Sequence, residues 1–262
     1  KKFYDDLNYE GLDSKVNKFE SKLKEFLKKN RLILEAAHKF SFDQGKTLKV
    51  SDILDHKEKF SGLEDLFNYL RENYLLSDIK VKFERYGSLI AELAEKQSKV
   101  IDVQFSGDEI KVDTHQYTDF INASIHLFRN MVDHGIETED ERIEKSKPQK
   151  GSITVDFKNN EDSFIICFKD DGRGIDPEKI KSKALNQGIL IEKDLEGMSE
   201  EDLLGIIFHP GFSTKEEVSD VSGRGVGMDA VKEEVLSLGG TISVKSTVDQ
   251  GTTFLIELPI LS

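Results

Sequence analysis

The chain has 262 residues, enough for two domains, and a formal net charge of −13 at pH 7. This acidity argues against nucleic acid as a partner, because duplex binding relies on clustered Lys and Arg. No apolar run approaches the ~20 residues of a membrane span and no signal peptide is visible, so membrane insertion is not expected. A single cysteine, Cys167, falls in a predicted core strand and is consistent with a reducing, cytoplasmic location.

Residues 1–77 predict a helical hairpin that forms a domain of its own. Apolar residues recur with alternating 4,3 spacing from Leu12 to Phe40 and again from Ile53 to Tyr74, the heptad pattern of helices that pack along a seam. Two chains could pair such hairpins into a four-helix bundle, so a homodimer is expected. The alternative is a hairpin packed on its own chain. Because the sequence begins at Lys1 without Met, we expect it to belong to a longer polypeptide.

Residues 78–262 predict an α/β two-layer sandwich with helices on one face of a sheet. The strand patterns at 100–105 and 110–113 flank Ser-Gly-Asp-Glu and favour a hairpin. The Lys- and Glu-rich stretch 137–150 is expected to be a solvated loop, and residues 175–222 a mobile lid. The other expected elements are strands at 152–157, 163–169, 241–246 and 253–258, and helices at about 82–98, 115–134, 176–187, 199–208 and 227–238.

The helix predicted at 115–134 carries the first candidate site. Residues three or four apart share a helix face, and the opposite face is apolar and would pack on a sheet. Asn130 offers a neutral amide oxygen for Mg²⁺, which prefers hard oxygen ligands. Gly135 is expected to end the helix in a left-handed conformation. The alternative is a solvated helix face with a capping glycine. The polar stripe consists of His126, Asn130, Asp133, His134 and Glu137.

The second candidate site follows the strand pattern at 163–169, where a carboxylate and two glycines occur as Asp170, Gly172 and Gly174. A carboxylate at this place can accept a hydrogen bond from a flat ligand that lies against bare backbone. Adenine's exocyclic amine is such a donor, whereas guanine presents a carbonyl oxygen there, so Asp170 is the candidate adenine reader. The alternative is an ordinary tight turn between strand and helix.

A second glycine-rich segment, Gly223, Gly225 and Gly227, opens the helix predicted at 227–238. Glycines at a helix start expose backbone N–H groups and the positive end of the dipole, which suits a phosphate. Upstream, Lys215 could reach a phosphate as a point charge or lie on a surface loop. No GxxxxGK[ST] segment occurs, which excludes a P-loop. The three ordered segments together predict an ATP pocket.

These motifs resemble the ATP-binding domain of CheA-like, chemotaxis-type histidine kinases, within the gyrase, Hsp90, histidine kinase and MutL superfamily of ATPases. The resemblance spans roughly residues 78–260. Two small departures are Met131, where Ala is common, and Ser146, where Gly is usual. The matching segments are H-L-x-R-N-x-x-D-H-G-I-E from His126, D-D-G-R-G-I-D from Asp170, P-G-F-S-T-K from Pro210, S-G-R-G-V-G-M-D from Ser222 and G-T-T-F-x-I-x-L-P from Gly251.

The resemblance implies ATP and Mg²⁺ as the bound groups, with Asn130 as the metal ligand. It places His126, His134 and Lys215 at the phosphates as catalytic residues. Asp170 with Gly174 would hold adenine. The remaining residues expected at the nucleotide are Asp133, Gly172, Ser213, Thr214, Gly223, Gly225, Gly227 and Thr252.

The resemblance also implies transfer of the γ-phosphoryl group to a histidine, with a response regulator downstream in two-component signalling. His38, His56, His115 and His209 lack a convincing acceptor motif. The acceptor is therefore expected on a histidine-phosphotransfer domain or protein outside this segment.

Two other functions remain open from the sequence. One is a regulatory pseudokinase that binds nucleotide without transfer, against which the complete set of pocket residues argues. The other is an ATPase of the same superfamily that uses ATP as a clamp. The close match of P-G-F-S-T-K and S-G-R-G-V-G-M-D favours the kinase over this ATPase.

Overall fold

The structure is a computed structural model that describes residues 62–212 and 227–261. The chain divides into two compact units, Lys1–Leu66 and Phe67–Ser262. The hairpin predicted for residues 1–77 therefore lies mostly outside the described residues. In chain order the described elements are α4 (Leu63–Leu70), η3 (Arg71–Leu75), β1 (Ser77–Asp78), α5 (Ile79–Glu84), α6 (Tyr86–Lys96), β2 (Ile101–Gly107), β3 (Lys111–Val112), α7 (Thr118–Ala123), α8 (Ile125–Asn130), η4 (Met131–Gly135), α9 (Glu139–Glu144), β4 (Gly151–Asn159), β5 (Ser163–Asp170), α10 (Pro177–Asn186), η5 (Glu192–Leu195), α11 (Glu200–Gly205), η6 (Ile206–Phe208), α12 (Met228–Ser237), β6 (Thr241–Thr247) and β7 (Gly251–Pro259).

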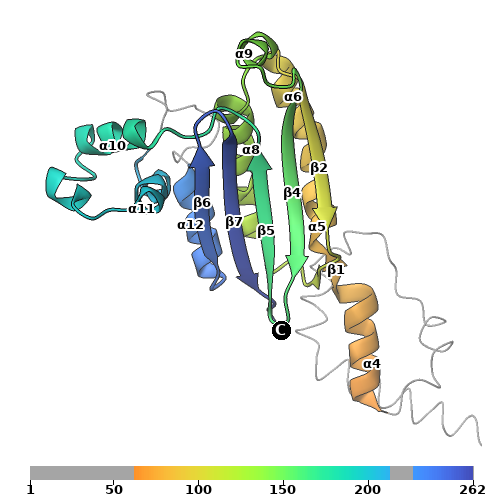
Figure 1. Cartoon of the computed structure of the whole chain (residues 1–262). Helices are drawn as coiled ribbons and strands as arrows, with labels where there is room; N and C mark the ends of the chain where they lie inside the picture. The colour runs from red at the N-terminus through yellow and green to blue at the C-terminus, as the bar shows by residue number, and fades with distance from the viewer. Residues whose placement is uncertain (1–61, 213–226, 262) are drawn as a thin grey trace, which may run out of the picture. The chain divides into compact units, whose positions relative to one another are not determined.

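A five-stranded mixed sheet forms the centre of the second unit (Figure 1), in the order β2-β4-β5-β7-β6. β2 runs parallel to β4 and the other neighbouring strands pair antiparallel. The two-layer α/β prediction is confirmed. The hairpin predicted across 100–113 is wrong, because β3 pairs with β1 instead, aligning Ser77 with Val112. Parallel strands need a long crossover, and α7, α8 and α9 supply it between β2 and β4.

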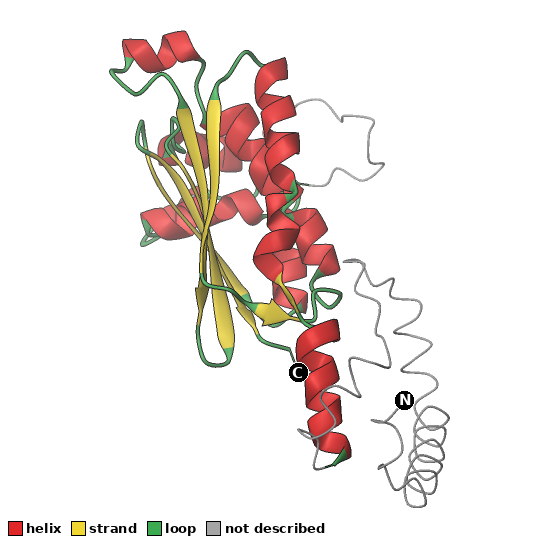
Figure 2. Ribbon diagram, turned by 90° about the vertical axis from the view of Figure 1, so that its right-hand side faces the viewer, coloured by secondary structure: helices red, strands yellow, loops and turns green. Residues whose placement is uncertain are grey.

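Alternating side chains give the sheet one core face and one exposed face. On β4, Ile153, Val155 and Phe157 are buried, whereas Asp156 between them is exposed. This alternation is typical of a strand with one face in the core. Helices α5 to α8 and α12 pack on the buried face (Figure 2). On the other face lies Cys167, which is half-buried rather than in the core.

Phenylalanine rings join the helices to the sheet. The ring of Phe168 on β5 packs edge-on against Phe83 of α5 and Phe128 of α8, with centroid distances of 5.7 and 5.5 Å. All three side chains are fully buried, and each contributes about 2–3 kcal/mol relative to an exposed side chain. This packing fixes the end of α8 against the end of β5, where the candidate site residues lie.

The helix predicted at 115–134 consists of α7, α8 and a π-helical turn, η4. The turn is closed by the Ile136 N–H, which donates to the Met131 carbonyl at 2.8 Å. Gly135 does not adopt the left-handed conformation expected of it, because the wider turn passes directly into extended backbone at Ile136. That prediction is wrong.

The described part of the predicted lid, up to residue 212, is helical. It comprises α10, η5, α11 and η6, which share a small apolar core of Ile180, Ala184, Leu190, Leu203 and Phe212. α11 lies alongside β6, the edge strand of the sheet (Figure 1). Residues 213–226 lie outside the described residues, and lid motion stays a prediction.

Candidate functional site

A cavity of about 180 Å³ lies at the junction of α8, β5, β7 and the start of α12. Its walls are mostly apolar, with polar groups at a few fixed points. Small-molecule sites typically have this composition. The described lining residues are Asn130, Met131, His134, Gly135, Asp170, Gly174, Ile175, Ile180, Ile207, Phe212, Gly227, Met228, Thr252 and Phe254.

The cavity brings together residues from all three motif segments of the sequence. Asn130 and His134 come from the helix motif, Asp170 and Gly174 from the first glycine segment, and Gly227 from the second. Thr252 of β7 joins them. Segments that are far apart in the sequence therefore line one cavity.

Three predicted residues lie elsewhere. His126, Asp133 and Gly172 are described in the structure but do not line the cavity. The Asp133 carboxylate instead accepts a hydrogen bond from the Gln97 side chain at 2.5 Å. The predicted Ser213, Thr214, Lys215, Gly223 and Gly225 fall outside the described residues.

Asp170 ends β5 as a nearly fully buried carboxylate, with 2% of its surface exposed. Its Oδ1 accepts a hydrogen bond from the Gly172 N–H at 2.9 Å. Burial raises the pKa of Asp170 to about 6, although backbone hydrogen bonds from Gly172 and Thr252 oppose the rise. At neutral pH the cavity therefore contains an ionised acceptor inside largely apolar walls.

Glycines allow the loop after Asp170 to lie directly under the β6–β7 turn. Gly174 has a φ of +68°, and a Cβ there would lie 2.2 Å from the Thr247 carbonyl oxygen. A Cβ on Gly251, whose φ is +114°, would lie 2.0 Å from the Asp170 carbonyl oxygen. Neither position tolerates a side chain, so this contact explains both glycines. It also places Thr252 beside the loop.

A hydroxyl pair completes this side of the cavity. The Ser246 Oγ accepts the Ile175 N–H at 2.7 Å and lies 3.0 Å from the Thr252 Oγ1. The Ser246 hydroxyl also donates to the Gly251 carbonyl at 2.9 Å. The orientation of Thr252 in the cavity wall is therefore fixed by the β6–β7 turn.

The π-helical turn η4 determines which helix residues reach the cavity. A turn wider than an α-helical one presents Asn130, Met131 and His134 on the same side. Its last carbonyls are satisfied by Lys99, whose Nζ donates to the Val132 oxygen at 2.6 Å and the Asp133 oxygen at 3.3 Å. The helix end is thus closed by a side chain from the loop before β2.

His126 lies one helical turn before Asn130 and is half-buried. Burial lowers the pKa of His126 below its usual value, and the charge of Arg129 lowers it further, against the opposing charge of Asp229. The imidazole is therefore mostly neutral at pH 7 and able to accept a proton.

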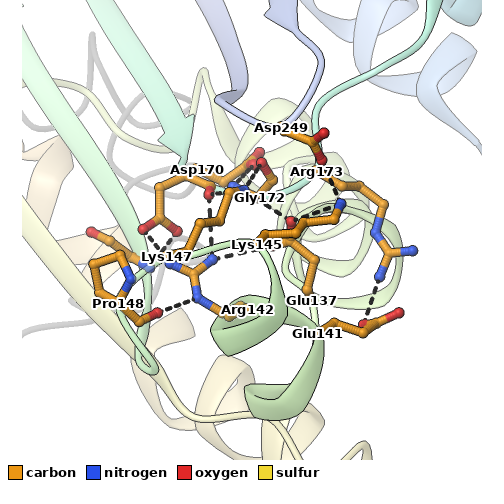
Figure 3. Close-up of polar contacts among 12 residues, drawn as sticks. Glu137, Glu141, Arg142, Lys145, Lys147, Pro148, Asp170, Gly172, Arg173 and Asp249 are labelled. Atoms are coloured by element: carbon orange, nitrogen blue, oxygen red, sulfur yellow. Dashed lines mark hydrogen bonds and ion pairs between the residues drawn. The ribbon is translucent and has the colours of Figure 1, made fainter.

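A polar cluster lies beside the cavity in the stretch 137–150 (Figure 3). The side chains of Arg142 and Glu137 are fully buried and paired at 3.1 Å. The prediction of a solvated loop here is wrong. Charged side chains can be buried when each meets a partner, and the composition of the stretch did not reveal those partners.

Sequence reasoning also missed the apolar walls of the cavity. Phe254 follows Thr252 by two residues on β7, so alternation along the strand could have found it. Ile180 and Phe212 come from the small core of the segment between β5 and α12. Phe212 belongs to the P-G-F-S-T-K motif, which could have marked it, whereas no motif marks Ile180.

Residues 118–262 match the family described as histidine kinase-, DNA gyrase B- and HSP90-like ATPases. The chain belongs to this family. The match covers more than half of the chain and includes every cavity residue named above.

The most similar curated relatives include CheA proteins. The chain is 39% identical to the chemotaxis protein CheA of Halobacterium salinarum over 81% of this chain and 31% of that protein. It is 34% identical to CheA of Bacillus subtilis, over 83% of this chain and 33% of that protein. The sensor histidine kinase CheAY of Helicobacter pylori is 38% identical, over 68% of this chain and 22% of that protein. The resemblance to a CheA-like ATP-binding domain is thus confirmed, and the chain spans about a third of the first two relatives.

Solved histidine kinase domains also match the chain, at low similarity. The catalytic domain of histidine kinase ThkA is 17% identical with a TM-score of 0.42, covering 71% of this chain and 94% of that one. The mycobacterial sensor histidine kinase MprB is 17% identical with a TM-score of 0.44, and the match covers 70% of this chain and 97% of that one. In the part of the chain that the structure describes, no helix is both long and apolar enough for a membrane span.

Proposed function

We propose that this chain is the ATP-binding core of a CheA-like histidine kinase that transfers the γ-phosphoryl group of ATP to a histidine on another domain or protein. The observation that carries the proposal is Asp170, an ionised acceptor buried in a largely apolar cavity. A purine whose exocyclic amine donates to this carboxylate fits such a site, whereas a keto group in its place would meet acceptor with acceptor.

Other residues that line the cavity suit a metal–phosphate group. Asn130 provides a neutral amide oxygen at the cavity wall, and Gly227 is the N-cap of α12, where backbone N–H groups form the positive end of the helix. Magnesium, when bound, would neutralise phosphate charge and draw its other ligands from phosphates and water. In this proposal the predicted Lys215 and the glycines at 223 and 225 also act on the phosphates.

Phosphoryl transfer asks a protein mainly to position the reactants and to balance charge. His134 lines the cavity beside Asn130, and His126 lies one turn away. In this proposal His134 donates a hydrogen bond to a phosphate. His126, which does not line the described cavity, is the proposed acceptor of the proton that the attacking imidazole releases.

The proposed partners follow from the resemblance to CheA-like histidine kinases and from the predicted helical hairpin. The phosphoacceptor is a histidine-phosphotransfer domain or protein, and a response regulator acts downstream. Homodimerisation through residues 1–77 and a cytoplasmic location complete the proposal.

Radiolabelled MgATP given to the purified chain, alone and with a histidine-phosphotransfer domain, tests the transfer step. Acid-labile label on protein supports the kinase. Release of free phosphate without protein label would identify an ATPase, and binding without turnover a pseudokinase.

Asn130→Ala tests the metal end of the site. We expect the variant to lose magnesium-dependent ATP binding in calorimetry, because the only side-chain amide among the described lining residues is removed. Asn122→Ala, on an exposed position of α7, is the matched control and should bind as the wild type does. Unchanged MgATP affinity of Asn130→Ala would refute the assignment.

A further inference from the structure

Three cations surround the buried carboxylate of Glu137 (Figure 3). Arg142 Nη1 lies 3.1 Å from Glu137 Oε2, Lys147 Nζ lies 2.8 Å from Oε1, and Lys145 Nζ lies 3.6 Å from Oε1. The Glu137 and Arg142 side chains are 1% exposed. Burial pushes the pKa of Glu137 up, but hydrogen bonds and the charges of Lys147 and Arg142 outweigh it, so the pKa lies below its usual value.

Two of these cationic side chains also donate hydrogen bonds to the turn that follows Asp170. Lys147 Nζ donates to the carbonyl oxygens of Asp171 and Gly172, at 2.9 and 2.6 Å. Arg142 donates to the Asp171 carbonyl at 3.3 Å and to its carboxylate at 2.7 Å. Lys145, in contrast, pairs with Asp249 on the β6–β7 turn.

The end of α9 holds Arg142 and Lys147 in place. The Lys147 N–H donates to the Arg142 carbonyl at 2.8 Å, and the Ser146 N–H to the Ile143 carbonyl at 2.9 Å. These two bonds form a Schellman motif, in which Ser146 takes the left-handed position with a φ of +58°. The Arg142 Nε also donates to the Pro148 carbonyl at 2.6 Å, so the guanidinium is held on several sides.

A single peptide unit connects these cations to the purine-reading carboxylate. Its carbonyl belongs to Asp171 and accepts from Lys147 and Arg142. Its N–H belongs to Gly172 and donates to Asp170 Oδ1 at 2.9 Å. Because the peptide group is planar, holding the oxygen in place also fixes the direction of the N–H. The orientation of the Asp170 carboxylate therefore depends on the cations behind it.

We infer that Lys147 and Arg142 are positioning residues that set base specificity, by fixing the peptide that orients Asp170 toward the purine. The inference rests on the proposed ATP site. It goes beyond it by assigning adenine discrimination to two residues that do not line the described cavity.

The chain offers a matched pair of variants. Lys147→Gln and Lys145→Gln remove the same charge two residues apart, and both lysines contact Glu137, but only Lys147 contacts the turn carbonyls. Dissociation constants are measured for a non-hydrolysable ATP analogue, the matching GTP analogue and magnesium tripolyphosphate, which has no base.

For Lys147→Gln we expect the ATP analogue to bind about tenfold more weakly, since a displaced orienting group weakens only the contact it orients. Binding of the GTP analogue and tripolyphosphate should change less than about twofold, so the ATP-to-GTP ratio falls about tenfold. Lys145→Gln should keep the wild-type ratio. Lys147→Met, which keeps an apolar stem, repeats the test if Lys147→Gln does not fold.

Two outcomes would overturn the inference: equal ATP affinities of the two glutamine variants, or a parallel loss of ATP and tripolyphosphate in Lys147→Gln. The second would indicate general damage to the site. A wild-type chain that binds neither nucleotide nor tripolyphosphate would instead refute the proposed function.

Discussion

Replacing Asp170 with Asn tests whether the cavity is built at a cost in stability. The carboxyl titrates at about 6 in the folded chain, against 3.8 for the free group. A shift of this size corresponds to about 3 kcal/mol of unfavourable free energy once the group is ionised. An amide at residue 170 avoids the ionisation but keeps one acceptor oxygen for the Gly172 and Thr252 N–H groups, so a net gain of about 1–2 kcal/mol is expected.

The sign of the pH dependence follows from proton linkage. The folded chain binds the Asp170 proton more tightly than the unfolded chain does, so the contribution of Asp170 to stability falls as pH rises from about 4 to about 6. Asp170→Asn has no ionisable group at residue 170, so its stability lacks this pH-dependent contribution. The variant should therefore gain stability over the wild type through this pH range and keep the gain at pH 7.5.

Urea unfolding at several pH values from 4 to 8 measures this difference, and calorimetry with an ATP analogue measures binding. We expect Asp170→Asn to be more stable at pH 7.5 and at least about 100-fold weaker in ATP binding, because an amide N–H₂ would face the purine amine. A variant that is less stable at pH 7.5, or a stability difference independent of pH, would refute the reasoning.

Two further substitutions test the polar cluster in the stretch 137–150. Ser146→Gly should raise the free energy of unfolding by about 0.5–1 kcal/mol in urea titrations, because Ser146 has a φ of +58° that glycine adopts without strain; no gain would exclude strain there. Glu137→Ala should lower it by about 3–5 kcal/mol, because the buried Arg142 loses a partner. Glu144→Ala, exposed on α9, is the control, and an equal effect of both alanine variants would contradict the buried-charge argument.

The sequence predicted the parts of the fold that short-range patterns determine. All five sheet strands were found near their observed bounds because side chains alternate along them, as in β4 and β7. The pairing of β2 was predicted wrongly, because a Gly-containing turn signal between two strand patterns does not show which strands are neighbours. β2 pairs instead with β4, which starts at Gly151, far along the chain.

The candidate site divides in the same way. Asn130, His134, Asp170 and Gly174 were found because they belong to motifs with local chemistry, and the structure brings all four to one cavity. Asp133 was expected there from its helix spacing and from the same motif, but the π-helical turn changes that spacing and leaves Asp133 against Gln97. Arg142 and Lys147 could not be found, since no sequence pattern encodes their contacts with the Asp171 and Gly172 carbonyls or shows that Glu137 is buried with them.

The cluster and the cavity together explain how one carboxylate stays available for a ligand. Three carboxylates, Glu137, Asp170 and Asp171, lie close enough that the charges of the other two raise the pKa of Asp170. Arg142 pairs with both Glu137 and Asp171, and Lys147 adds a second cation to Glu137. Asp170 is held by backbone N–H groups instead. Its neighbours therefore have cationic partners, whereas the charge of Asp170 is stabilised by backbone N–H groups and by a donor that enters the cavity.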